Sequence, residues 1–286
     1  MLTLNAYAKI NLALDVLYKR PDGYHEVAMI MQAISLSDTV TLTRQPEDIE
    51  LSVNIRGLAA DASNLAYRAA ALLRDYAKTA QGVHIKLDKR IPLAAGLAGG
   101  SADAAAVLKG LNLLWELNLD MEELSKLAAK LGSDVPFCLY GGTMLATGRG
   151  EKVAPLSPLP SCYVILAKPA VEVPTAWVYG QFKADKALAR PDIAVIRQYL
   201  ELGDLAGVAK RMVNVLESVT IPAYPEIARI KEFMLEYGAM AALMSGSGPT
   251  VFGLTESLEQ AETVAGRLKA RGVPEIFIAE TVSEVE

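Results

Sequence analysis

Histidine and cysteine are almost absent from this 286-residue sequence, which contains two of each. A zinc site built from several histidine and cysteine ligands is therefore close to excluded. The two cysteines, Cys138 and Cys162, are far apart in the sequence and form no C-x-x-C motif. So few cysteines are typical of a reduced, cytoplasmic protein rather than of a secreted disulfide framework.

An excess of positive charge is also missing. The sequence has 28 Lys and Arg against 33 Asp and Glu, which gives a formal net charge of −5. Nucleic-acid-binding proteins normally show a basic excess or a basic patch, and neither is evident here. We therefore expect no nucleic-acid partner.

Membrane and secretion segments are not expected either. The longest uncharged run, residues 237–255, is interrupted by the glycine- and proline-containing segment 245–249, and it reads as two strands joined by a loop. The first ten residues include the polar Asn5 and Lys9, so no signal peptide is evident. A cytoplasmic protein without membrane contact is the expectation.

The chain is rich enough in apolar residues, at 52%, to form a substantial core, and its length suits one large domain or two ordinary ones. A proline-rich stretch at 154–160 is the best candidate linker. Alternating apolar residues predict strands near 10–16, 27–34, 39–43, 49–55, 83–87, 162–167, 240–244, 250–254 and 275–279. Helical periodicity predicts helices near 63–80, 102–117, 120–132, 175–182, 192–202, 204–215, 225–237 and 257–271. This mixture predicts a two-domain α+β protein, with domains at 1–156 and 161–286 and the site in the cleft between them.

The small, glycine-rich segment 92–101 precedes a predicted helix. Glycine and alanine let the backbone approach a ligand closely, and the free N–H groups at a helix start favour an anion such as a polyphosphate. Taken alone, the segment could also be a tight strand-to-helix turn capped by Ser101. Asp103, in the first turn, could complement the helix dipole or lie near a metal shared with phosphate.

A second loop of small residues, 245–249, lies between two predicted strands in the C-terminal half. Such a segment is an ordinary hairpin turn about as often as a ligand loop, but two such loops facing one cleft strengthen each other. Near the N-terminus, Lys9 and Asn11 fall on the strand face opposite Ile10 and Leu12. Lys9 could be an exposed edge lysine, or a cation held near a reacting hydroxyl or a phosphate.

Two further segments offer side chains suited to a binding site. Asp134 lies at a bend between Gly132 and Pro136, where it could be a turn or cap residue or could project into a cleft as a general base. Residues 20–25 form a turn around Pro-Asp-Gly, next to Tyr24 and His25. These two rings could recognise a nucleobase, or His25 could be an ordinary turn histidine.

Together these motifs resemble the GHMP kinases over nearly the whole chain. The Asp-Gly-Tyr-His element is the most specific of them, because it separates one branch of the family from kinases of homoserine, mevalonate and galactose. The matching segments are 8–12 with 20–25, 92–105, 131–136 and 244–249.

The resemblance implies two α+β domains, the first like ribosomal protein S5 domain 2 and the second ferredoxin-like. It also implies transfer of the ATP γ-phosphoryl group, with Mg²⁺ bridging the phosphates, to a tertiary hydroxyl of a cytidine diphosphate-linked polyol, a step in isoprenoid precursor synthesis. The partners would be these small molecules alone, with the protein a monomer or weak homodimer.

The family pattern also assigns roles to individual residues. Asp134 would be the base and Lys9 its partner, Asn11 would contact the substrate, and Tyr24, His25 and Tyr179 would hold the cytosine ring. Ser101 would contact the metal. ATP would be held by Asn64, Lys89, Pro92, Leu93, Ala94, Ala95, Gly96, Leu97, Ala98, Gly99, Gly100, Ser101 and Ala102.

Two positions depart from the commonest form of the family loop. Ala98 replaces a glycine, which is tolerable if its φ is negative, and Ala102 replaces a serine, which leaves only a backbone contact there. Two other interpretations stay open. The protein could be a GHMP kinase for another alcohol such as homoserine or mevalonate, although Tyr24, His25 and Tyr179 argue against this. It could also be a regulatory nucleotide-binding module, although such a module is expected to lack Lys9 or Asp134.

Overall fold

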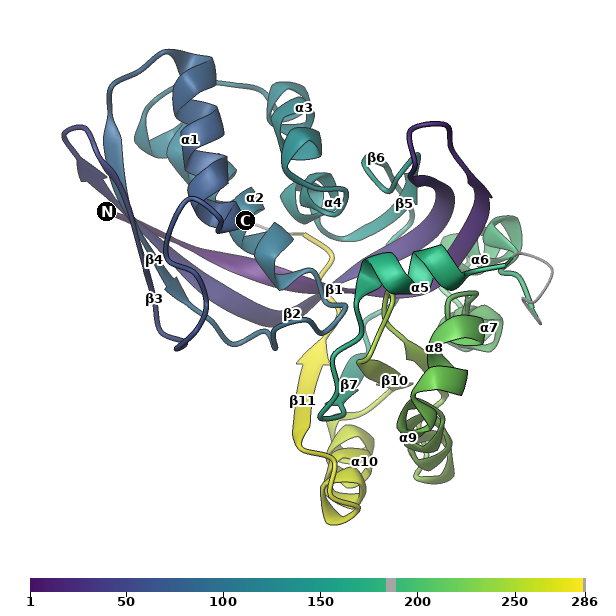
Figure 1. Cartoon of the computed structure of the whole chain (residues 1–286). Coiled ribbons are helices and arrows are strands. Elements are labelled where there is room, and N and C mark those ends of the chain that lie inside the picture. Colours follow the sequence, from purple (N-terminus) through teal and green to yellow (C-terminus); the bar gives the residue numbers. More distant parts are fainter. Residues whose placement is uncertain (184–188, 285–286) are drawn as a thin grey trace.

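Two β-sheets with their covering helices organise the chain (Figure 1). The structure is a computed structural model and describes residues 1–183 and 189–284. The first sheet has the strand order β3-β4-β2-β1-β8, with β5 pairing with another part of β2 and with β6. Its strands are β1 (Leu2–Lys19), β2 (His25–Gln45), β3 (Ile49–Val53), β4 (Gly82–Asp88), β5 (Thr143–Thr147), β6 (Lys152–Pro155) and β8 (Val213–Asn214).

The long hairpin of β1 and β2 forms the centre of this sheet and is buried on both faces over much of its length. Its antiparallel register is interrupted between Tyr7 and Lys9 and again between Asn11 and Ala13. Such irregularities bend a strand and redirect its side chains, and they are frequent beside active sites. Here they flank the segment that contains Lys9 and Asn11.

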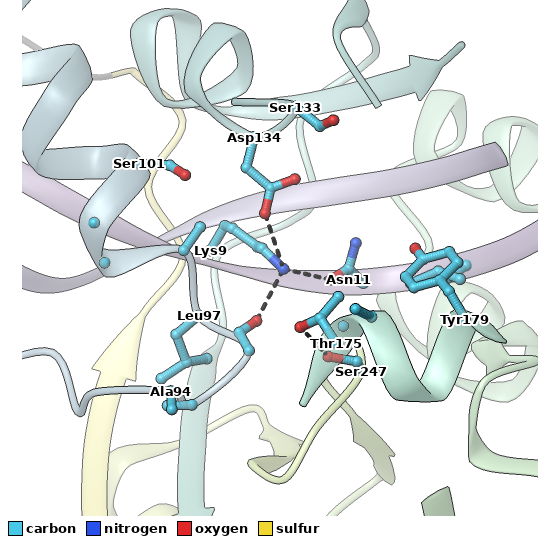
Figure 2. A pocket seen from close by; sticks show the side chains of 18 of the residues that line it. Lys9, Asn11, Ala94, Leu97, Ser101, Ser133, Asp134, Thr175, Tyr179 and Ser247 are labelled. Carbon is cyan, nitrogen blue, oxygen red and sulfur yellow. Dashed lines mark hydrogen bonds and ion pairs between the residues drawn. The ribbon is translucent and has the colours of Figure 1, made fainter. Parts of the chain in front are cut away.

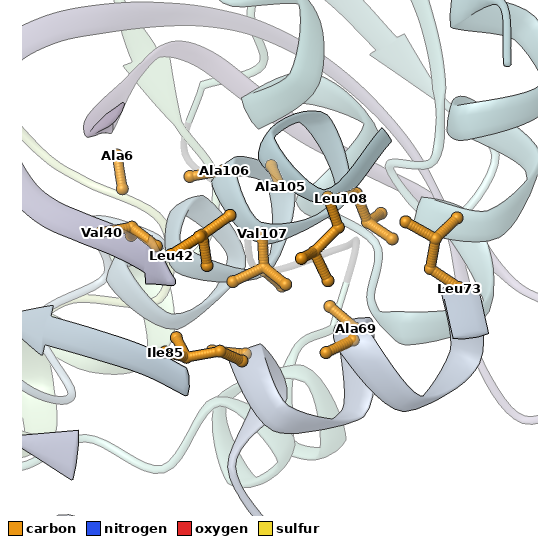
Figure 3. Packing of buried hydrophobic residues seen from close by; sticks show 14 of the residues in the cluster. Ala6, Val40, Leu42, Ala69, Leu73, Ile85, Ala105, Ala106, Val107 and Leu108 are labelled. Atoms are coloured by element: carbon orange, nitrogen blue, oxygen red, sulfur yellow. The ribbon is translucent and has the colours of Figure 1, made fainter. Parts of the chain in front are cut away.

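Helices α1 (Leu65–Ala77), α2 (Gly99–Leu114), α3 (Met121–Leu131) and α4 (Val135–Tyr140) lie on one side of the first sheet (Figure 1). Small side chains let α2 pack closely between α1 and the strands, with Ala105 and Val107 in the shared core (Figure 3). A Cβ at Gly110 would collide with the side chains of Leu4 and Leu42. This packing fixes the helix that begins directly after the glycine-rich loop.

The second sheet is antiparallel, with the order β11-β7-β10-β9. Its strands are β7 (Tyr163–Lys168), β9 (Ala241–Met244), β10 (Val251–Thr255) and β11 (Glu275–Glu280). The helices of this half are α5 (Thr175–Gln181), α6 (Ile193–Glu201), α7 (Leu205–Arg211), α8 (Glu217–Ala223), α9 (Pro225–Glu236) and α10 (Leu258–Ala270). Helices connect β7 to β9 and β10 to β11, so this half has the ferredoxin-like β-α-β-β-α-β arrangement, as predicted.

The two halves are joined by backbone pairing as well as by side-chain packing. β8 pairs in parallel with β1, and Thr281 forms a bridge with Ile34 of β2. The C-terminal half therefore contributes to the first sheet, and a boundary between residues 156 and 161 does not separate the two halves cleanly. The exact domain limits stay a prediction.

Most predicted elements are present, with several corrections. The two strands expected at 27–34 and 39–43 are one strand, β2, and the expected linker at 154–160 begins inside β6. The uncharged run 237–255 follows α9 and forms β9, a loop and β10, in agreement with the prediction of two strands around a loop. In the two described ranges, every helix is too short or too polar to cross a membrane.

Candidate active site

A cavity of about 840 Å³ lies between the glycine-rich loop after β4, the β9–β10 loop, helix α5 and strand β1. It brings together residues from both halves of the chain. Of the site residues predicted from the sequence, those that line it are Lys9, Asn11, Tyr24, His25, Lys89, Asp134, Tyr179 and residues 92–101. Asn64 and Ala102 do not line it.

Lys9 and Asp134 face each other in this cavity (Figure 2). The Nζ atom of Lys9 is 3.8 Å from Oδ2 of Asp134, and it donates hydrogen bonds to Oδ1 of Asn11 (2.8 Å) and to the carbonyl oxygen of Gly96 (2.9 Å). The Lys9 side chain is only 4% exposed. Lys9 is therefore not an exposed edge lysine, and its charge is directed at the cavity and the loop.

The side chain of Asp134 is available for chemistry. Asp134 precedes α4 in the N-cap position, yet within the described chain its carboxylate makes no capping hydrogen bond. It is 31% exposed, which is enough to receive a substrate group from the cavity. The structure thus does not support the alternative of a cap residue, because the carboxylate faces Lys9 instead.

The glycine-rich loop presents its backbone to the cavity and then opens into α2, which begins at Gly99, three residues earlier than predicted. Gly96 has φ +74°, and a Cβ at this position would collide with the carbonyl oxygen of Ser245. Lys9 N donates to Leu97 O (3.1 Å), and Ser245 Oγ donates to Gly96 O (3.0 Å). The middle of the loop is therefore held by β1 on one side and by the β9–β10 loop on the other.

Ala98 has φ +60°, so the negative φ under which alanine would be unstrained there is not observed. A left-handed conformation costs a non-glycine residue about 1–2 kcal/mol. Relief of this strain is partly offset, because glycine loses more conformational entropy on folding than alanine does, which costs about 0.5–1 kcal/mol. We expect Ala98→Gly to raise the free energy of unfolding by up to about 1 kcal/mol, measured by urea denaturation.

The control for this prediction is Ala105→Gly, inside α2, the helix that follows Ala98. This change is expected to destabilise the protein by about 1 kcal/mol or more. If Ala98→Gly destabilises the protein as much as Ala105→Gly does, the strain argument is wrong.

The β9–β10 loop reaches the cavity because β8 holds it. Asn214 lies beside Leu14 of β1, and its Nδ2 donates to the carbonyl oxygens of Met244 (2.8 Å) and Gly246 (2.7 Å). Gly246 then lies close to the Lys9 ammonium. The expectation that the two small-residue loops face one cleft is confirmed.

The opposite end of the cavity is aromatic. The rings of His25 and Tyr179 lie 5.5 Å apart, inclined by 38°. Burial, with a smaller contribution from the charge of Lys19, lowers the pKa of His25, so the imidazole is neutral near pH 7. Burial raises the pKa of Tyr179, which therefore stays a phenol.

Some cavity residues were not predicted from the sequence. Arg149, in the turn between β5 and β6, places its guanidinium 4.8 Å from the centre of the Tyr24 ring. Thr175 and Ser247 share a hydrogen bond of 2.8 Å at the cavity wall (Figure 2). Ser247 belongs to the small-residue loop 245–249, but no local motif marks Arg149 or Thr175, because the role of each depends on a neighbour that only the fold provides.

Two predicted nucleotide contacts need correction. Asn64 is the N-cap of α1. Its Oδ1 accepts from Ala66 N (2.9 Å) and its Nδ2 donates to Ala59 O (2.8 Å), so its side chain holds the start of α1 and the segment before it. The N–H of Ala102 donates to Ala98 O (2.9 Å) inside α2, so it cannot also bind a phosphate. Lys89 does line the cavity, but its ammonium is paired with Asp38 and Asp103.

A loop whose amides open into a helix, beside a paired lysine and aspartate, is the arrangement expected of an enzyme that transfers a phosphoryl group to a small alcohol. Residues 64–142 match the family model for the GHMP kinases N terminal domain, and residues 187–274 match that for GHMP kinases C terminal. The chain belongs to the GHMP kinase family. Kinases of this family use ATP as the phosphoryl donor.

Individual relatives agree with this family. The chain is similar to 4-diphosphocytidyl-2-C-methyl-D-erythritol kinases from Geobacillus sp. (strain WCH70), with 54% identity over 89% of this chain and 88% of the relative, and from Listeria monocytogenes serotype 4b (strain CLIP80459), with 48% identity over 100% and 97%. A crystal structure of 4-(cytidine 5'-diphospho)-2C-methyl-D-erythritol kinase matches with a TM-score of 0.84 and 35% identity, over 98% of this chain and 99% of that one. A homoserine kinase from Cytophaga hutchinsonii ATCC 33406, with 21% identity, a TM-score of 0.76 and coverage of 99% and 96%, shares the fold.

Proposed function

We propose that this protein transfers the γ-phosphoryl group of ATP to the 2-hydroxyl of 4-diphosphocytidyl-2-C-methyl-D-erythritol, giving the 2-phosphate and ADP, in non-mevalonate isoprenoid biosynthesis. One observation carries the proposal: a single cavity has the glycine-rich loop and the Lys9–Asp134 pair at one end and the rings of Tyr24, His25 and Tyr179 at the other. The names of the relatives support the choice of substrate.

The aromatic end of the cavity suits a cytosine ring. Tyr24 and Tyr179 provide flat faces for stacking, and the neutral imidazole of His25 has one hydrogen-bond donor and one acceptor for the edge of the base. Asn11 accepts a hydrogen bond from Lys9 at Oδ1, and its Nδ2 donates to Sδ of Met29 (3.6 Å), which leaves the second N–H of the amide to contact a hydroxyl of the polyol. The substrate is thus oriented with its reacting hydroxyl toward Lys9 and Asp134.

The transfer step needs a base, a charge partner and an aligned phosphate. Asp134 accepts the proton of the 2-hydroxyl while the new O–P bond forms to the γ-phosphorus and the bond from that phosphorus to the β–γ bridging oxygen breaks, releasing ADP. The ammonium of Lys9 stabilises negative charge on the acceptor oxygen and the transferring group. The amides of residues 96–101 hold the remaining phosphates.

The residues present fit a Mg²⁺ ion that binds together with ATP. Mg²⁺ is commonly held by substrate phosphates, water and one or two protein oxygens. Groups of three or more acidic, histidine or cysteine side chains that could hold a metal do not occur among the described residues, whereas Ser101 and Asp134 place oxygens in the cavity. When bound, the ion neutralises phosphate charge during the transfer.

The decisive experiment is an ADP-release assay with purified protein, ATP and Mg²⁺. We expect turnover with the cytidine diphosphate substrate and none above background with homoserine or mevalonate. Preferred turnover of either alcohol would overturn the substrate assignment. If no ADP is released with any of the alcohols, the proposed activity is wrong and the protein is better interpreted as a regulatory nucleotide-binding module.

Tyr24→Ala tests the aromatic end. Base–aromatic stacking contributes about 1–3 kcal/mol, so the KM for the cytidine substrate is expected to rise about 10- to 100-fold, with the KM for ATP nearly unchanged. Initial rates with each substrate varied in turn measure both constants. The matched control is Tyr18→Ala, because Tyr18 is an exposed tyrosine in the same hairpin that does not line the cavity. An effect confined to ATP would show that the two subsites are exchanged.

A further inference from the structure

Three charged side chains form a buried cluster beneath the glycine-rich loop. Lys89 donates hydrogen bonds from Nζ to Oδ2 of Asp38 and to Oδ2 of Asp103, the latter at 2.5 Å. The three side chains are at most 4% exposed. The cluster is therefore almost completely buried, although Lys89 lies at the wall of the cavity, directly against the loop.

The cluster ties together the two ends of the loop. Asp38, in β2, also accepts hydrogen bonds at Oδ1 from the N–H groups of Arg90 (2.5 Å) and Ile91 (2.8 Å), where the chain enters the loop. Asp103 lies in the first turns of α2, where the chain leaves the loop. A Cβ on Gly99 would lie 3.4 Å from the Lys89 ammonium, so this charge is directly under the start of the helix.

The loop needs such anchoring. Ala94 and Ala98 both have positive φ, at 50° and 60°. Strained backbone of this kind persists only where the surrounding structure over-determines it. Lys9 and Ser245 hold the middle of the loop, and the cluster holds its two ends.

The cluster itself is a poor source of stability. Burying charges costs desolvation energy, and well-packed apolar residues often replace a buried ion cluster without loss. The second oxygen of Asp103, Oδ1, accepts no hydrogen bond from the residues that the structure describes, which adds to the cost. We therefore expect the cluster to hold the loop in place rather than to raise the overall stability of the protein.

We propose that Asp38, Lys89 and Asp103 are positioning residues that hold the glycine-rich loop in its ATP-binding conformation, and that Lys89 acts on ATP through the loop rather than by touching a phosphate. This inference rests on the proposed function and refines it, since the family resemblance alone assigns Lys89 to ATP directly.

Steady-state kinetics of Lys89→Met, Asp103→Asn and their combination separate the two interpretations. We expect each single variant to raise the KM for ATP about tenfold or more, and the combination to be no worse than either, because both changes open the same anchor. The kcat at saturating ATP and the KM for the cytidine substrate are expected to stay within about twofold. If Lys89 touches a phosphate, Asp103→Asn leaves the KM for ATP unchanged while Lys89→Met raises it, and the proposal is overturned.

The matched control is Lys86→Met. Lys86 lies in β4, three residues before Lys89, and pairs with Asp88 at 3.1 Å, but both side chains are exposed and neither lines the cavity. We expect wild-type kinetics for this variant. An equal rise in the KM for ATP would show that the effect is not specific to the buried cluster.

Hydrogen exchange without nucleotide tests the loop itself. In Lys89→Met the amides of residues 92–101 are expected to exchange at least about tenfold faster than in the wild type, with those of β10 unchanged. If that variant does not fold, Asp103→Asn, which keeps the side-chain shape, decides the question. Unchanged loop exchange, or equal acceleration throughout, contradicts the proposal. Because hydrogen exchange is measured without turnover, it tests the anchoring of the loop even if the proposed kinase activity is wrong.

Discussion

Replacing Asp134 by alanine is expected to lower kcat by about 10²–10⁴-fold, the usual contribution of a general base. The carboxylate faces Lys9 at 3.8 Å, and in the proposed mechanism it takes the proton of the acceptor hydroxyl. Binding of ATP is expected to persist, because the loop is held by other contacts. Single-turnover rates give the loss in the chemical step, and titration with a fluorescent ATP analogue gives the affinity.

A second aspartate provides the matched control. Asp120 also precedes a helix, but there it is a true cap: its Oδ1 accepts from Glu123 N at 2.8 Å, and Oε2 of Glu123 accepts from Asp120 N at 3.1 Å. Asp120→Ala is expected to cost about 1 kcal/mol of stability and to leave kcat unchanged. Asp134→Ala is expected to show the reverse pattern. Retained turnover in Asp134→Ala would remove this residue from the mechanism.

Local patterns predicted those parts of the fold whose causes are local. The capping box of Asp120 and Glu123 is formed as expected, because both partners lie within one turn. Alternation around Lys9 and Asn11 placed these side chains on one face, and the structure joins them by a hydrogen bond. Small residues in 92–101 indicated a loop opening into a helix, which is present.

Other elements depend on contacts between distant segments and could not be predicted in this way. The two-residue strand β8 exists only because β1 lies beside it, and the six-residue helix α4 is too short to show a helical period. The expected linker overlaps β6 because a short strand that pairs with β5 can end in proline.

The site shows the same division. Lys9, Asp134 and the loop have sequence motifs, whereas the position of Arg149 over Tyr24 requires two turns that meet only in the folded chain. Asn64 and Lys89 were assigned to ATP by resemblance, yet one caps α1 and the other is paired with two buried carboxylates. A motif match alone proposes which residues bind a ligand, but position in the fold and hydrogen-bond partners decide what each side chain is free to do.

Lys9→Met is expected to affect both chemistry and nucleotide binding. Loss of the ammonium removes a preorganised positive charge from the acceptor oxygen, which typically lowers kcat about 10²–10³-fold. It also removes the hydrogen bond from Nζ to the carbonyl oxygen of Gly96, so the KM for ATP is expected to rise as well. Ser245 Oγ still donates to that oxygen, so the loop is weakened rather than released. Thermal unfolding of the variant checks that the fold is retained.

Combining Lys9→Met with Asp134→Asn tests whether the two side chains act on one acceptor oxygen. If they do, each single change already disables the same proton transfer, so the double variant is expected to have nearly the kcat of the slower single variant. Independent action predicts that the two losses multiply, giving a total of about 10⁴-fold or more. Multiplied losses would place Lys9 on the phosphates instead of on the acceptor hydroxyl. The distance of 3.8 Å between Nζ of Lys9 and Oδ2 of Asp134, together with the burial of Lys9, favours a shared acceptor oxygen. Before the substrate binds, the buried ammonium faces the carboxylate of the proposed base, so a hydroxyl that reaches the base also meets the ammonium.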